Sequence, residues 1–98
     1  MKLDTLAEAL HVVRTFKLDA MDLLLLDRVL HAKREKGEAT IMAIMKCGLA
    51  SDATINKRLK KLVNAGMLIK GTKAENLRFK PLESGAELET LLVALENI

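Results

Sequence analysis

Basic side chains are concentrated between residues 51 and 71, in the segment SDATINKRLKKLVNAGMLIKG. This segment carries five Lys or Arg residues and a single acidic residue, Asp52. Ammonium and guanidinium groups bind phosphate oxygens, and a segment with nearly one sign of charge is suited to an anionic partner. The chemistry indicated by this segment is therefore binding of a polyanion.

The positive charge of the whole chain is unevenly distributed. The net charge is +3, but residues 51–82 hold eight Lys or Arg residues and two acidic residues, whereas residues 83–98 hold four Glu and no base. This asymmetry indicates an anionic partner for the middle third of the chain. The chain has two Phe and no Trp or Tyr, which argues against stacking on single-stranded nucleic acid. Double-stranded DNA is therefore the expected partner.

Helical geometry separates residues 51–65 into two faces. At about 100° per residue, Ile55, Leu59 and Leu62 share one stripe, which we expect to be buried. The alternative is that the opposite face is simply exposed to solvent. Such faces usually mix both signs of charge, whereas this one has no carboxylate. Its first turn is small and hydroxylated, which suits close approach to a groove floor. The residues of this helix predicted to contact DNA are Ser51, Ala53, Thr54, Lys57, Lys60, Lys61 and Asn64.

Different contacts are expected from these residues. We expect Thr54, Lys57 and Asn64 to contact base edges, because hydroxyl, ammonium and amide groups can pair with the donors and acceptors in the major groove. Lys60 and Lys61 are expected to contact phosphates.

Turn and cap residues place this helix in a helix-turn-helix. Thr40 predicts the start of a short helix over residues 41–47, Gly48 ends it, and Ser51 caps the next helix. A short helix, a tight turn containing Gly and a second capped helix have the spacing of a helix-turn-helix. We therefore predict this motif over residues 40–65.

Two runs with strand character follow the helix-turn-helix. Residues 67–70 and 77–80 are predicted to form a hairpin, closed by Pro81 at the end of its second strand. A hairpin in this position is a wing, here expected over residues 67–81. An alternative is a solvated hairpin whose charges blunt its strand edges. The wing residues predicted to contact DNA are Lys73, Asn76 and Arg78, with Lys73 and Arg78 on phosphate or in the minor groove.

Three further amphipathic helices are predicted. One begins at Asp19 and ends at Gly37, and its four successive leucines, Leu23 to Leu26, predict a central helix packed on two sides. The other two lie at the ends, over residues 3–16 and 84–98. Their apolar stripes could fold back on the domain or join a second subunit. We expect a homodimer, because the acidic last helix would lie away from DNA.

The order of elements predicts a mainly α fold with a small β-hairpin wing, in a single domain over residues 1–98. The run Ser51 to Lys57, Leu62 and the stretch AGMLIK resemble the winged-helix DNA-binding domain of the MarR-type regulators (multiple antibiotic resistance regulators). The resemblance covers about residues 19–85 and implies sequence-specific binding of double-stranded DNA by a transcriptional regulator.

Two positions depart from the pattern of that family. Asn76 stands where the family usually has the Asp of an Asp-x-Arg wing motif, so the resemblance implies weaker positioning of Arg78. The stretch Leu82-Glu83-Ser84-Gly85 is one residue shorter than the family's Leu-Thr-x-x-Gly helix start.

No residue pattern indicates catalysis, a metal ion or a cofactor. His11 and His31 are far apart, and the lone Cys47 has no partner for an intrachain disulfide, which fits a reducing, cytoplasmic compartment. Asp4 and Glu8 interrupt any apolar run of the kind that a secretory signal needs, and no run is long enough to cross a membrane. We therefore expect neither enzymatic activity nor membrane association.

Two other functions are compatible with the same sequence. A winged helix can serve as a protein interaction module, in which the basic face would meet an acidic protein, because a fold does not define a function. A replication or partition accessory protein of a plasmid or phage would share the DNA chemistry and differ in its role.

Overall fold

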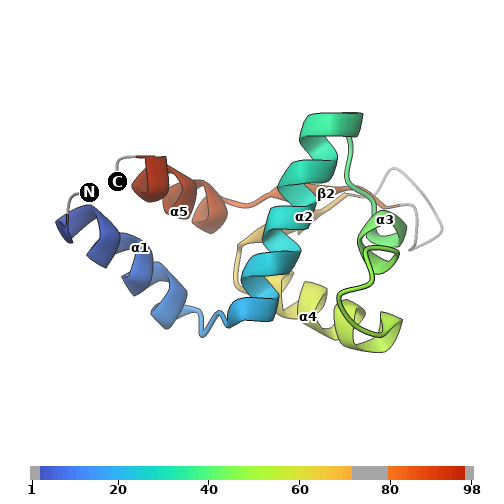
Figure 1. Ribbon diagram of the computed structural model, residues 1–98, viewed down its shortest axis with the longest axis horizontal. Coiled ribbons are helices and arrows are strands. Elements are labelled where there is room, and N and C mark those ends of the chain that lie inside the picture. Colours follow the sequence, from blue (N-terminus) through green and yellow to red (C-terminus); the bar gives the residue numbers. More distant parts are fainter. Residues whose placement is uncertain (1–2, 72–79, 97–98) are drawn as a thin grey trace.

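The computed structural model describes residues 3–71 and 80–96 of the chain, and these are mainly helical (Figure 1). None of the described helices is long and apolar enough to span a membrane. The predicted fold class is confirmed: a winged helix-turn-helix with a helix at each end. The elements in chain order are α1 (Leu3–Thr15), α2 (Ala20–Lys36), α3 (Ile41–Met45), α4 (Asp52–Asn64), β1 (Leu68–Lys70), β2 (Leu82–Ser84) and α5 (Ala86–Glu96).

Local capping residues define the ends of α2, α3 and α4. Asp19 is the N-cap of α2, where it forms a capping box with Asp22, and Gly37 ends the helix with a φ of 77°. Glycine adopts this left-handed conformation at little cost because it has no Cβ. Thr40 and Ser51 cap α3 and α4, and each side-chain oxygen accepts from the backbone N–H three residues later. The caps and the helix end predicted at these positions are therefore confirmed.

The core is built around α2, which packs against α3, α4 and β2. Leu25 and Val29 of α2 are fully buried, as is Ile55 of α4. The prediction that α2 is packed on two sides is wrong, because Leu23 is 39% exposed and Leu24 is 48% exposed. The main neighbours of α2 are α3, α4 and β2, whereas α1 packs mainly against α5 (Figure 1).

The wing strands pair antiparallel, but the second strand comes later than predicted. Lys70 in β1 lies opposite Leu82 in β2, so the strand follows Pro81, which therefore does not close it. Leu82 belongs in the strand because its side chain is fully buried and its N–H donates to Ala39 O at 2.7 Å. Of the strand predicted over residues 77–80, residues 77–79 lie outside the described part of the chain.

A close backbone contact delays the start of the last helix. The sequence predicted this helix from Ser84, whereas α5 begins at Ala86. The N–H of Gly85 donates to Met67 O at 2.9 Å, and a Cβ on Gly85 would lie only 2.0 Å from Gly66 O. Glycine is therefore required here, and the contact holds the junction between β2 and α5 against the backbone of Gly66 and Met67.

The terminal helices and the helix-turn-helix lie at opposite ends of the molecule. Figure 1 shows α1 and α5 side by side at one end of the long axis, with α3 and α4 toward the other. The first turn of α1 and the last turn of α5 lie close together. The helix-turn-helix is therefore presented away from the terminal helices.

Candidate nucleic-acid interface

Helix α4 buries the stripe that the sequence predicted. Ile55 and Leu62 are fully buried and Leu59 is 3% exposed, which turns the opposite face outward. This confirms the predicted rotation of the helix about its axis. The predicted contact residues that are exposed on α4 and at its N-cap are Ser51, Ala53, Thr54, Lys57, Lys60 and Asn64.

The N-terminal tip of α4 presents two hydroxyl groups that bind each other. Ser51 Oγ accepts from the Thr54 backbone N–H at 3.3 Å and donates to Thr54 Oγ1 at 3.0 Å. In this arrangement the Thr54 hydroxyl can donate its own hydrogen to an external acceptor. A phosphate oxygen or the acceptor edge of a base would meet this requirement.

The four basic residues of α4 divide into two pairs. Lys57 and Lys60 are exposed, and neither has an ion-pair partner within residues 3–71 and 80–96. Arg58 instead contacts both carboxylates at the start of α2, Asp19 and Asp22, the latter at 3.3 Å. Lys57 and Lys60 are thus the two cations of α4 that no carboxylate of the described residues engages.

Within the described residues, Lys61 is bound to groups of its own chain, unlike Lys57 and Lys60. Its ammonium group forms an ion pair with Asp22 and donates to Lys17 O at 2.9 Å. Its side chain is 37% exposed. A carboxylate on α2 lies within reach of this flank of α4, so the Lys61 ammonium group is paired within the chain, and its contact with phosphate stays a prediction.

Asp22 is the residue beside α4 whose contacts the sequence did not predict. Its side chain is fully buried and accepts from the Asp19 N–H at 3.1 Å, from Arg58 and from Lys61. Its contacts could not be read from the sequence, because its partners Arg58 and Lys61 are 36 and 39 residues away. The sequence contained one signal for these contacts: Asp19 and Asp22 are three residues apart, and so are Arg58 and Lys61.

The contacts between α2 and α4 shift the pKa of two groups. The Arg58 guanidinium, which donates to Asp19, and the backbone N–H of Asp22 lower the pKa of the Asp19 carboxyl from 3.8 to about 2. Asp19 and then Asp22 raise the pKa of Arg58 above its ordinary value. The carboxylate therefore stays ionised well into the acid range.

We expect the stability that Asp19 contributes to be lost in acid. The unfolded chain binds this proton near its ordinary pKa of 3.8 and the folded chain only near 2. The contribution to the free energy of unfolding is therefore complete above about pH 4 and falls toward pH 2. Asp19→Asn keeps a good N-cap and should flatten the pH dependence of the urea midpoint over this range. Asp27→Asn is the control and should follow the wild type; parallel curves for all three proteins would contradict the assignment.

The predicted wing contacts, Lys73, Asn76 and Arg78, lie outside the described residues. The structure places the wing strands directly after α4, since Met67 N donates to Leu62 O at 2.9 Å at the end of the helix. The wing therefore begins beside the C-terminal end of α4.

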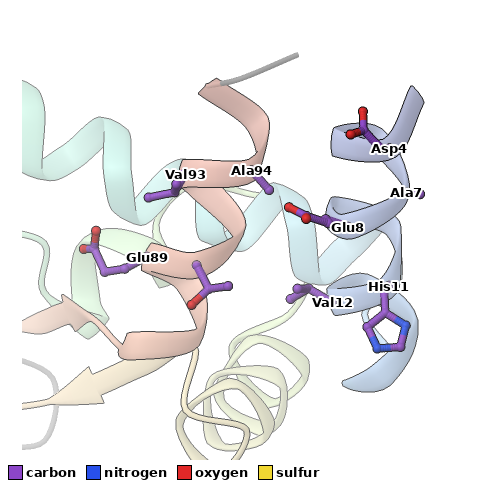
Figure 2. A pocket seen from close by; sticks show the side chains of 9 residues that line it. Asp4, Ala7, Glu8, His11, Val12, Glu89, Val93 and Ala94 are labelled. Carbon is purple, nitrogen blue, oxygen red and sulfur yellow. The ribbon is translucent and has the colours of Figure 1, made fainter. Parts of the chain in front are cut away.

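A groove separates the two terminal helices. It has a volume of about 880 Å³, and Ala7, Val12 and Ala94 are among its apolar lining residues. Figure 2 shows the carboxylate of Glu8 directed from α1 toward α5, with Glu89 on the facing helix. The groove is thus apolar with acidic groups beside it, which makes it unsuited to nucleic acid.

The fold is shared with a solved structure of known class. No protein-family profile matches the chain, and no curated protein matches it either. The crystal structure of a transcriptional regulator from Thermotoga maritima superimposes with a TM-score of 0.60 at 17% sequence identity. This chain shares the fold of that regulator. The match covers 93% of this chain and 64% of the other, so the chain spans somewhat less than two thirds of the regulator's length.

Proposed function

We propose that this protein is a transcriptional regulator of the MarR type that binds double-stranded DNA sequence-specifically in the cytoplasm, with α4 in the major groove. The observation that carries the proposal is the outer face of α4. There Lys57 and Lys60 are exposed without an ion-pair partner in the described part of the chain, behind the small hydroxylated tip of Ser51 and Thr54. A helix end of this kind can approach the groove floor while its cations meet the flanking phosphates.

The proposed contacts follow from the position of each side chain. Thr54, Lys57 and Asn64 are exposed along one face and would meet base edges, while Lys60 would meet the phosphate backbone. Ser51 and Ala53 would permit close approach of the helix end. In the wing, Lys73, Asn76 and Arg78 are proposed to contact the adjacent backbone or minor groove.

Selection of genomic DNA fragments by the purified protein, followed by a salt series on the selected site, tests this function. Three phosphate contacts per protomer (Lys60, Lys73 and Arg78) would give about six in a dimer, so log affinity should fall with log salt at a slope of about −5. A slope near −2, or no enrichment of any fragment, would contradict the proposal. Retention of an acidic protein with no DNA enrichment would instead support a protein interaction module.

We further propose that the protein is a homodimer joined through α1 and α5. Both helices expose large apolar side chains: Leu3 is 77% exposed and Leu10 57% on α1, while Leu95 is 46% exposed on α5. Such a patch at the end away from α4 suits a subunit interface. A twofold dimer would place two copies of α4 in successive major grooves, about 34 Å apart.

A double substitution in the terminal helices tests the dimer. Leu10→Glu with Leu95→Glu should give a monomer in sedimentation equilibrium at tens of micromolar protein, because two charges would enter an apolar interface. Leu24→Glu is the control, since Leu24 is similarly exposed but lies on α2. A monomeric wild type that binds its selected site with full affinity would overturn the dimer.

A further inference from the structure

Four charged residues form a cluster between the start of α2 and the middle of α4. Asp19 and Asp22 supply the carboxylates, and Arg58 and Lys61 supply the cations; we call them the counter-ion cluster. Two of the four basic residues of α4 are thus engaged by carboxylates of the same chain. They are the pair on the flank that faces α2.

These two cations are not hidden from an external anion. The Arg58 side chain is 30% exposed and that of Lys61 is 37% exposed. Both line a hollow of about 400 Å³ that is also bordered by Asp19 and by Thr54 and Lys57 of the proposed DNA-facing surface. A phosphate group of DNA bound against this surface would therefore lie beside both cations.

Stability alone does not require ion pairs between α2 and α4, although Asp19 and Asp22 also cap α2. Burying a carboxylate is costly, and well-packed apolar residues often replace a buried ion pair with no loss of stability. The cluster does, however, satisfy the two cations with oxygens of the same chemical kind that a phosphate backbone would offer. Its effect on α4 is to remove two positive charges from competition for phosphate.

We propose that Asp19 and Asp22 act as internal counter-ions that withhold Arg58 and Lys61 from the DNA backbone, so that DNA of any sequence is held mainly by the remaining cations. This inference rests on the proposed function. Asp19 and Asp22 are positioning residues, because they act through Arg58 and Lys61 and do not touch DNA themselves.

The consequence is a lower affinity for non-specific DNA. Each cation that neutralises a phosphate steepens the dependence of log affinity on log salt by about 0.9. Withholding two cations per protomer therefore reduces the slope by about 2 and weakens binding to mixed-sequence DNA. Base contacts are unaffected, so the ratio of specific to non-specific affinity rises, and this ratio governs site occupancy in a genome.

The test compares two double variants with the same change in charge. Asp19→Asn with Asp22→Asn releases both cations, whereas Asp27→Asn with Asp52→Asn removes two exposed carboxylates from the same two helices. Asp27 and Asp52 have no ion pair within residues 3–71 and 80–96. Binding of a labelled mixed-sequence duplex is measured by fluorescence anisotropy over a salt series, after circular dichroism has shown that each variant is folded.

The cluster variant should bind the mixed-sequence duplex at least about tenfold more tightly than the control variant near 0.1 M salt, with a slope steeper by about 2 per protomer. Its affinity for the selected site should change less, so the specificity ratio should fall. A gain in affinity with a steeper slope is not what simple loss of structure would produce. Equal slopes for the cluster and control variants would overturn the inference.

Two further measurements keep the result interpretable. If Asp22→Asn does not fold, Asp19→Asn alone is compared with Asp52→Asn, because Asn is as good an N-cap as Asp; the expected steepening is then about 1. If the wild type binds no DNA, the proposed function fails, and elution from heparin, a sulfated polyanion, tests the counter-ions separately. The cluster variant should then elute at higher salt than the control, and equal elution would overturn the inference.

Discussion

Replacing Lys57 and Lys60 of α4 by glutamate is expected to lower the affinity for the selected DNA site by at least about 100-fold near 0.1 M salt. Loss of the Lys60 phosphate contact should cost roughly tenfold at 0.1 M relative to 1 M salt, because log affinity falls by about 0.9 per contact for each decade of salt. Loss of the Lys57 base contact should cost about as much again. The two new carboxylates would also repel the backbone. Both side chains are exposed and unpaired within the described residues, so the fold should be unchanged. Anisotropy with the labelled site measures the affinity, and thermal unfolding checks the fold.

A matched control separates local contact from overall charge. Arg34→Glu with Lys36→Glu makes the same change in net charge in the last turn of α2, which is roughly 20 Å along the helix from Asp22. This variant should lose only the long-range part of the attraction, which salt screens strongly. Comparable losses in the two double variants would show that α4 is not the DNA-binding helix.

Replacing Asp22 by alanine is expected to lower the free energy of unfolding by about 3 kcal/mol. Removing one member of a buried ion pair leaves the partner charges without compensation, and here it also leaves the Asp19 N–H without its acceptor. Arg58 and Lys61 can turn partly toward water, which keeps the expected loss near the lower end of the range for buried pairs. Urea denaturation followed by circular dichroism provides the measurement.

The control for this prediction lies on the same helix. Asp27→Ala removes an exposed carboxylate from α2 and should change the free energy of unfolding by less than about 0.5 kcal/mol. A loss below about 1 kcal/mol for Asp22→Ala would mean that the carboxylate is not a structural link between α2 and α4. Together the two values isolate the contribution of the buried contacts from that of charge alone.

Local patterns predicted the parts of the fold that depend on neighbouring residues. The N-caps Asp19, Thr40 and Ser51 and the left-handed Gly37 were identified correctly, because a cap is satisfied within one helical turn. The buried stripe of α4 was also predicted, since helical periodicity alone places its apolar residues on one face. These features were enough to identify the winged helix-turn-helix and the outward face of α4.

Contacts between distant segments decided what local patterns could not. The second strand was predicted too early because residues 77–80 alternate in polarity, whereas β2 is held by pairing with β1 and by the buried side chain of Leu82. The exposure of Leu23 and Leu24 depends in the same way on which elements pack against α2. The hydrophobic periodicity of one segment does not determine which other segment of the chain packs against it.

Residues 51–65 show most clearly what the sequence determines and what the tertiary structure decides. The sequence by itself determined that residues 51–65 form a capped helix, and that its positive charge lies off the buried stripe. It could not determine which of those cations are available to an anion. That depends on Asp22, which meets Arg58 and Lys61 only after α2 and α4 have packed. Charge on a helix follows from its sequence, but the pairing of that charge follows from the distances between helices in the folded chain.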